Sequence, residues 1–303
     1  MVTLERNAAG LGQVRRRYAG RAQLRVDEVA VEQRFRIANG WFFWSTRLLP
    51  APRRKAMHAL YVFCGEVSSI ADGEASRTLK LALLADWHAQ IALLYAGRPE
   101  RPVTRALRDA VDKFHLCGED FLAIIEGMKT VSRTDLRAPS YEQLDLYCEQ
   151  TAVAVGRIAL RILGAGELDG ERLAAALGRG MQLTGILRDL AHDAVRQRLY
   201  LPRELLHEHG IFATMPSYVL AQPALPEICN ALAERATAHF ADAKRAIPAH
   251  PRSAMLATTA ILSSYRTLLD RLLARGWMRL DEPVRIPAWC QSALVMGPGL
   301  IGH

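Results

Sequence analysis

The chain has 303 residues, of which half are hydrophobic and 23% are charged, and its formal net charge at neutral pH is +8. This composition is typical of a globular protein and excludes intrinsic disorder, collagen-like repeats and low-complexity segments. No window of about 18 apolar residues occurs, so the sequence predicts no membrane-spanning helix. The positive charge favours anionic partners, but the arginines are dispersed without interleaved aromatic residues, so we expect no nucleic-acid partner.

The cysteines and the N-terminus point to a reduced compartment. The five cysteines lie far apart and form no Cys-x-x-Cys pair, which argues against zinc or thiol redox sites. The N-terminus lacks the apolar stretch of a secretory signal. We therefore expect a cytoplasmic protein. A peripheral membrane contact is an alternative, because the apolar segment 286–301 could dock on the domain or lie on a membrane surface.

Apolar residues recur at helical spacing along most of the chain, whereas no segment shows the alternation of a strand. Ser140 and Gln143 have the spacing of a capping box at the start of a helix. The pattern predicts an all-α fold, with one helical domain over 36–303 after a weakly ordered basic segment over 1–35. The expected helices cover 53–72, 76–96, 103–115, 119–131, 140–164, 169–196, 224–246 and 251–275.

An acidic helix segment carries the clearest chemical signal. Asp189 and Asp193 are four residues apart, so both carboxylates lie on one face of a helix, where like charges repel. Gln182 continues the same stripe, and the leucines and isoleucine between these residues indicate burial. A buried stripe of oxygen donors suits Mg²⁺, whereas the alternative is a solvated pair of surface aspartates.

Three arginines follow this acidic pair within eight residues, Arg196, Arg198 and Arg203. Guanidinium groups bind phosphate oxygens through paired hydrogen bonds, so these residues are candidates for a phosphate clamp. The alternative is a solvated helix end, where arginine is favoured by the helix dipole.

Four sequence segments together resemble the squalene/phytoene synthase family of prenyltransferases. The run Gln-Leu-Thr-x-Ile-Leu-Arg-Asp-x-x-x-Asp, with Arg-Leu-Tyr-Leu-Pro-Arg-Glu after it, resembles the second aspartate-rich signature of that family. The segments 47–64, 147–156 and 275–285 resemble its first signature region, its middle segment and its C-terminal part. The resemblance spans 38–288 and is strongest to the bacterial hopanoid-pathway branch, whose members make presqualene diphosphate from two farnesyl diphosphates.

This resemblance implies a single all-α isoprenoid-synthase domain with a central cavity, where Mg²⁺ and arginines hold prenyl diphosphate substrates. A partner enzyme of the same pathway is a further implication. The implied catalytic residues are Asp72, Asp189, Asp193 and Tyr265, and the three aspartates are also the implied metal ligands. The implied diphosphate-binding residues are Gln182, Arg188, Arg198, Arg266 and Arg285.

The departures from the family pattern are concentrated at ligand positions. The first signature, usually Arg-Glu-Val-Asp-Asp-Ile-x-Asp, keeps only its last aspartate, because Gly65, Ser68 and Ser69 replace the arginine and two aspartates. Trp41 stands where the family has a diphosphate-binding serine. Gly185 replaces an asparagine of the second signature.

Three hypotheses are compatible with this pattern. The first is the family activity, Mg²⁺-dependent head-to-head condensation of two farnesyl diphosphates. The second is an altered enzyme that uses one prenyl diphosphate, either to prenylate a neutral acceptor or to form a terpene. The third is a non-catalytic relative that binds an isoprenoid or serves as an assembly factor.

Overall fold

The computed structural model describes residues 27–33, 49–133, 137–165, 167–249 and 252–284, without the side chains of 167–168 and 252–254. Within these ranges the chain is helical, with one isolated β-bridge between Arg137 and Leu199 and no strand. The all-α prediction is therefore confirmed. None of the described helices is both long enough and apolar enough to cross a bilayer.

The long helices begin and end within two residues of their predicted bounds. They are α3 (Ala51–Asp72), α4 (Arg77–Tyr95), α5 (Pro102–Phe114), α6 (Gly118–Arg133), α9 (Glu167–Val195), α12 (Leu225–Ala246) and α13 (Arg252–Arg275). The helix expected over 140–164 is present without a gap, but its middle is π-helical. Its three parts are α7 (Tyr141–Cys148), the π-helical turn η1 (Glu149–Val153) and α8 (Ala154–Leu163). Two short helices, α10 (Arg203–Glu208) and α11 (Pro216–Leu220), and the 3₁₀ turn η2 (Ile247–Ala249) were not predicted.

Local signals account for several helix boundaries. At the start of α7, the Ser140 hydroxyl accepts a hydrogen bond from the Gln143 N–H, and the Gln143 side chain accepts one from the Ser140 N–H. This is the predicted capping box, and it satisfies two backbone donors that the helix leaves unpaired. At the end of α8, Gly164 adopts a left-handed conformation with φ of 92°, which glycine tolerates without strain.

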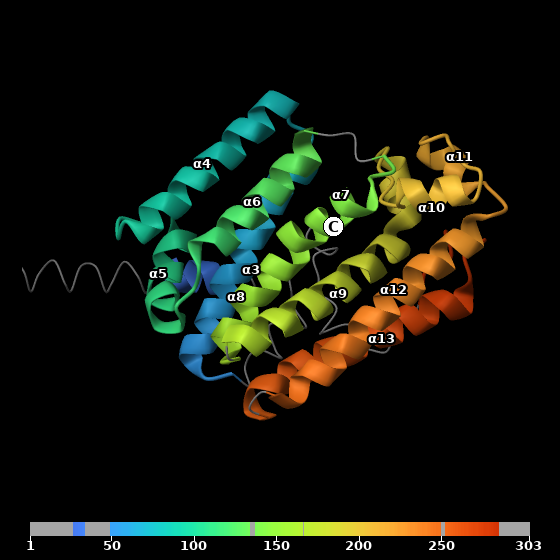
Figure 1. Cartoon of the computed structure of the whole chain (residues 1–303). Coiled ribbons are helices and arrows are strands. Elements are labelled where there is room, and N and C mark those ends of the chain that lie inside the picture. The colour runs from blue at the N-terminus through green and yellow to red at the C-terminus, as the bar shows by residue number, and fades with distance from the viewer. Residues whose placement is uncertain (1–26, 34–48, 134–136, 166, 250–251, 285–303) are drawn as a thin grey trace, which may run out of the picture.

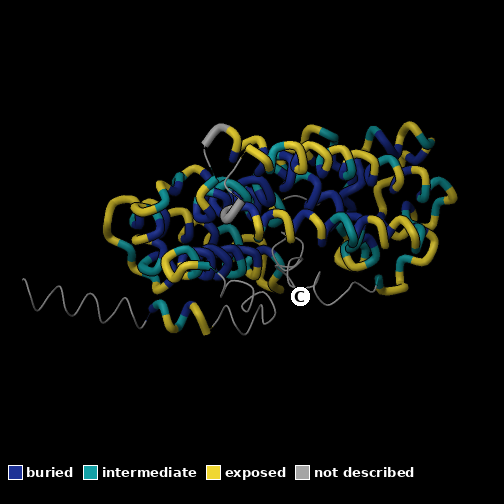
Figure 2. Tube along the Cα trace, turned by 90° about the horizontal axis from the view of Figure 1, so that it is seen from below, coloured by how far each residue is buried: buried dark blue, intermediate teal, exposed yellow. Residues whose placement is uncertain are grey.

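Helix α9 occupies the middle of the molecule. Figure 1 shows α9, α12 and α13 running alongside one another, while α3, α4, α5, α6 and α8 form the other part of the helical array. Buried residues form a continuous interior that the exposed turns surround (Figure 2). Residues 27–33 form a further helical turn, whose Asp27 and Glu28 pair with Arg105 of α5 and Lys55 of α3.

Two glycines let α9 approach its neighbours closely. A Cβ at Gly178 would lie 2.9 Å from the Val153 backbone, and one at Gly180 would lie 2.8 Å from the Phe240 ring. Real Cβ atoms do not come so close, so glycine at these positions sets the spacing of α9 from η1 and α12. The packing thereby fixes the depth at which α9 side chains enter the interior.

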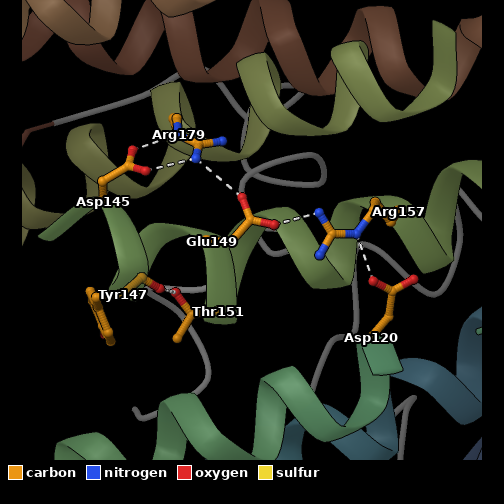
Figure 3. Close-up of polar contacts among 7 residues, drawn as sticks. All are labelled: Asp120, Asp145, Tyr147, Glu149, Thr151, Arg157 and Arg179. Carbon is orange, nitrogen blue, oxygen red and sulfur yellow. Dashed lines mark hydrogen bonds and ion pairs between the residues drawn. The ribbon is translucent and has the colours of Figure 1, made fainter. Parts of the chain in front are cut away.

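A chain of ion pairs holds η1 against its surroundings (Figure 3). Arg179 of α9 binds Asp145 at 2.6 and 2.9 Å and Glu149 at 3.1 Å, and Arg157 of α8 joins Glu149 to Asp120 of α6. Burial raises the pKa of Asp120, and Arg157 opposes that shift. Four helical segments are thus tied together around the π-helical turn.

The packing of α9 can be tested by adding a single methyl group. Gly178→Ala should lower the free energy of unfolding by about 1–3 kcal/mol, because the new Cβ overlaps the Val153 backbone. Gly65→Ala in α3 is the matched control, since no heavy atom lies within 4 Å of its added Cβ. The control should gain up to about 1 kcal/mol from its better helix propensity. Urea denaturation measures both values, and equal effects of the two substitutions would contradict the close approach.

Candidate functional site

The second half of α9 carries the predicted acidic stripe. Asp189 and Asp193 lie one turn apart, and the apolar residues beside them, Leu183, Ile186, Leu187 and Leu190, are all buried. Gln182 is 95% buried two turns earlier, and its Oε1 has no hydrogen-bond partner among the described residues. Asp189 and Asp193 themselves are partly buried, and the Asp189 side chain is 18% exposed.

Arginine neutralises the first of the two carboxylates. The Arg188 guanidinium donates from Nε and Nη2 to the two oxygens of Asp189, at 2.7 and 2.5 Å. Tyr265 of α13 is buried nearby, and burial raises the pKa of its phenol while the charge of Arg188 opposes that rise. Arg188, Asp189 and Tyr265 therefore meet where α9 faces α13.

The segment after α9 reaches across to α3. Arg198 donates to the Asp72 carboxylate at 2.8 Å, and Arg196 lies 3.7 Å from the same oxygen. Asp72 is the last residue of α3, so this ion pair joins residues 126 positions apart in the sequence. The structure thus brings together Asp72 of the first signature region and the arginines that follow the second signature.

Three carboxylates consequently share one partly buried region. The pKa of Asp193 is raised to about 7, mainly by burial and then by the negative charge of Asp189, while Arg198 opposes and Asp72 adds to the rise. Crowded carboxylates of this kind are stabilised by a bound cation. Asp189 and Asp193 on α9 therefore fit a divalent ion with oxygen ligands.

The α3 side of the region does not fit a second ion in the same way. Ser68 is buried, and the hydroxyl of the exposed Ser69 donates to the Glu66 carbonyl of its own helix at 2.9 Å. Gly65 has open space around its Cβ position. Among the described residues, no group of three or more histidine, cysteine or acidic side chains is arranged to hold a metal.

An apolar hollow lies along the first half of α9. Mostly small and aliphatic residues of η1, α8, α9 and α13 line it, among them Gly156, Leu163, Met181 and Ile261, together with Tyr61 of α3. Met181 adjoins Gln182, and Ile261 lies one turn before Tyr265. The hollow and the polar region are therefore both bordered by α9 and α13, with the hollow on the N-terminal side along each helix.

The remaining predicted site residues do not all join this region. Arg266 follows Tyr265 on α13, but its guanidinium pairs with Asp270 on the same helix at 3.5 Å. No contact of the described residues connects it to the acidic region. Gly185 lies on α9 between Gln182 and Asp189. Trp41 and Arg285 lie outside the described residues.

Sequence reasoning missed two aromatic residues of the site. The rings of Tyr147 and Tyr200 stack with centroids 5.1 Å apart. Burial raises the pKa of Tyr200 to about 12, and Arg198 and Asp193 also act on it, so the pair borders the acidic region. Both tyrosines stand inside segments that resemble the family. Tyr147 belongs to the Tyr-Cys segment and Tyr200 to Arg-Leu-Tyr-Leu-Pro, so their positions in these segments were the available sequence signal.

Comparison with known proteins is consistent with this geometry. A family model described as squalene/phytoene synthase matches residues 40–290. Presqualene diphosphate synthase from Rhodopseudomonas palustris is 43% identical over 84% of this chain and 91% of its own length. Phytoene synthase from Arthrospira platensis is 30% identical over 82% of this chain and 84% of its own.

Solved structures agree with the fold. The crystal structure of squalene synthase from Alicyclobacillus acidocaldarius superposes with a TM-score of 0.75 at 25% identity, covering 86% of this chain and 97% of that one. A dehydrosqualene synthase structure superposes with a TM-score of 0.77 at 23% identity, covering 91% and 96%. The isoprenoid-synthase fold expected from the resemblance is therefore confirmed.

The raised pKa of Asp193 predicts a specific dependence of stability on pH. In the unfolded chain this carboxyl ionises near its ordinary pKa of about 4, but in the folded protein only near 7. Its ionisation therefore costs stability, and that cost grows as pH rises from about 4 to about 7. Asp193→Asn should remove the cost and be more stable than the wild type above pH 7, by on the order of 2–4 kcal/mol in metal-free buffer.

Urea denaturation at pH 4.5 and pH 8, in the presence of EDTA, measures this difference. Asp270→Asn is the control, because Asp270 is an exposed carboxylate on α13 outside the acidic region. A difference between wild type and Asp193→Asn that stays constant with pH would contradict the assignment.

Proposed function

The chain belongs to the squalene/phytoene synthase family, and we propose that it condenses two farnesyl diphosphates head to head into presqualene diphosphate. It is thus a prenyltransferase. The observation that carries this proposal is the composition of α9, which holds the acidic, arginine-paired region at one end and lines the apolar hollow at the other. A prenyl diphosphate has the same two parts, a charged head and an apolar chain.

We propose that Mg²⁺ is held by Asp189 and Asp193, with Asp72 facing them from α3. When bound there, the ion would offset the charge of a departing diphosphate. The requirement for a divalent metal is general in this family. The carboxylate pair on α9 supports the assignment, because Asp193 carries a raised pKa that a cation would relieve.

The arginines of the site would share in stabilising the leaving group. Arg188 and Arg198 are held in place by the carboxylates of Asp189 and Asp72, so both guanidinium groups lie beside the proposed metal ligands. A guanidinium held in position costs little reorganisation when negative charge develops beside it. Gln182, with its unpaired buried oxygen, points to a further polar contact on the same face of α9.

The apolar hollow would protect the reactive carbon. Breaking the carbon–oxygen bond of one substrate leaves an allylic cation, which water would trap. Aliphatic side chains exclude water from the hollow, so the cation can add to the double bond of the second substrate. One diphosphate and one proton leave, and the product keeps the other diphosphate on its cyclopropane-bearing chain.

One observation favours a second candidate function. On the α3 side Asp72 is the one aspartate at a first-signature position, and both Arg196 and Arg198 pair with it. A site that binds metal and diphosphate firmly on the α9 side alone would suit an enzyme that uses one prenyl diphosphate with a neutral acceptor. The two candidates differ in what restoring acids on α3 would do.

Removal of the α9 carboxylates tests the proposed site. Asp189→Ala combined with Asp193→Ala should lower kcat/KM for farnesyl diphosphate with Mg²⁺ on the order of a thousandfold, because metal and leaving group lose their anchor. Released diphosphate and the mass of the extracted product measure it. Asp86→Ala is the control, since Asp86 pairs with Arg101 near the exposed α4 surface. A C30 diphosphate made at an unchanged rate by the double variant would contradict the assignment.

Restoration of the first signature separates the two candidates. Ser68→Asp with Ser69→Asp should raise kcat/KM by about tenfold or more if two farnesyl diphosphates are condensed, since a first-motif anchor is regained. Under the single-substrate alternative the rate should not rise. Ser68→Asn with Ser69→Asn is the matched control, because asparagine has the same shape without the charge. An equal gain in both double variants would show that charge is not the cause.

A further inference from the structure

The π-helical turn η1 interrupts an otherwise regular helix between α7 and α8. The Ala154 N–H donates to the Glu149 carbonyl, five residues earlier, which is the hydrogen bond of a π-helix. Inside the turn, the Thr151 hydroxyl donates to the Tyr147 carbonyl at 2.7 Å. Single π-helical turns are rare and occur frequently at functional sites. The surrounding structure must therefore stabilise this turn against the regular α-helix.

Both helices that flank η1 carry a glycine where they meet it. A Cβ at Gly127 of α6 would lie 3.0 Å from the side chain of Thr151 and 3.1 Å from that of Gln150. On the other side, a Cβ at Gly178 of α9 would lie 2.9 Å from the Val153 backbone. A π-helical turn holds more residues than an α-helical one and is wider. Glycine on both sides leaves the room that the wider turn needs.

Glu149 is the residue that ties the turn to its neighbours by charge. Its two carboxylate oxygens bind Arg157 of α8 at 2.5 Å and Arg179 of α9 at 3.1 Å. Hydrogen bonds between ionised partners are about twice as strong as those between neutral groups. Figure 3 shows Glu149 between the two arginines, whereas Tyr147 and Thr151 point away from Arg179. The first residue of the turn is thus held on the side away from Tyr147.

The turn sets the direction in which Tyr147 points. An α-helix rotates by about 100° per residue, so one additional residue in the turn rotates α7 by about 100° relative to α8. In the resulting orientation the Tyr147 ring stacks on Tyr200, with 5.1 Å between the centroids and 16° between the planes. Burial, then Tyr200 and Asp193, raise the pKa of Tyr147, which therefore lies beside the acidic region. A regular α-helical connection would turn Tyr147 away from both.

We propose that Glu149, held by Arg157 and Arg179, is a positioning residue for the condensation. It stabilises the π-helical turn, and the turn places Tyr147 beside Asp193. The three ion-paired residues act on the reaction through Tyr147 and not by contact with substrate. The effect on turnover rests on the proposed function, whereas the placement of Tyr147 does not.

The placement of Tyr147 can be measured without substrate by ¹⁹F NMR of the full chain labelled with 3-fluorotyrosine. The Tyr147 resonance is the one that disappears in Tyr147→Phe. Tyr200→Leu should shift this resonance, because it removes the stacked ring. In a Glu149→Gln background, where the side chain keeps its shape but loses its charge, Tyr200→Leu should no longer shift it. An equal shift in both backgrounds would overturn the proposal.

Turnover tests whether this placement matters for the reaction. Glu149→Gln should lower kcat for farnesyl diphosphate with Mg²⁺ by about tenfold to a hundredfold and change KM by less than about threefold, because substrate binds but meets a displaced Tyr147. Tyr147→Phe should lower kcat as well. Adding Glu149→Gln to Tyr147→Phe should cost little more, since both changes act through one residue. Losses that multiply in the double variant, or a Tyr147→Phe variant with wild-type kcat, would contradict the positioning role.

Asp145→Asn is the matched control, because Asp145 also binds Arg179 but precedes the turn, and its side chain is 58% exposed against 32% for Glu149. Exposed ion pairs contribute little, so this variant should keep the wild-type kcat and the shift of the Tyr147 resonance. A control that loses as much as Glu149→Gln would overturn the proposal.

Thermal unfolding shows whether each variant is folded. If Glu149→Gln does not fold, Arg179→Gln leaves Glu149 paired with Arg157 and should show the same two effects more weakly. A folded Arg179→Gln variant with wild-type kcat and spectrum would then count against the proposal. A wild type that releases no diphosphate would count against the proposed function alone, and the ¹⁹F measurement would still decide the placement of Tyr147.

Discussion

The balance between buried carboxylates and arginines on and after α9 is the interaction on which the site depends. Asp189 and Asp193 stand on a helix whose other faces pack in the interior, where charge is costly. Arg188 offsets Asp189, and Arg198 offsets Asp72, whereas Asp193 is only partly compensated and carries a raised pKa. This under-compensated carboxylate is the feature on which the proposed binding of a cation and a diphosphate rests.

The same balance explains why the two sides of the site are unequal. On α9 each acid has an arginine or another acid within interaction distance, so the side chains form a charged cluster. On α3 two serines have replaced acids, and one of them hydrogen-bonds to its own helix. The loss of negative charge leaves Arg196 and Arg198 to share the single carboxylate of Asp72. Presqualene diphosphate synthases that are 40–43% identical to this chain are among its relatives.

The two halves of α9 have different neighbours. Glycines 178 and 180 let the helix lie deep between η1 and α12, which places the hollow along its first half. The ion pairs around η1 hold the π-helical turn beside it (Figure 3). Its other end leads through Tyr200 into α10. One largely buried helix therefore relates the apolar hollow to the charged region.

Helical periodicity determined the long helices, because amphipathic spacing and caps such as Ser140 act within a few residues of sequence. The four-residue spacing of Asp189 and Asp193 likewise determines that both acids lie on one face of α9, whatever packs against that helix. Periodicity could not reveal the π-helical turn, the short helices α10 and α11, or the ion pair of Asp72 with Arg198. Those features arise from contacts between segments far apart in the chain, and such contacts leave no regular spacing in the sequence. The sequence by itself determined which residues can carry the charge and the helices, and only the tertiary structure decided which charges meet, because desolvation and ion pairing depend on distance in space.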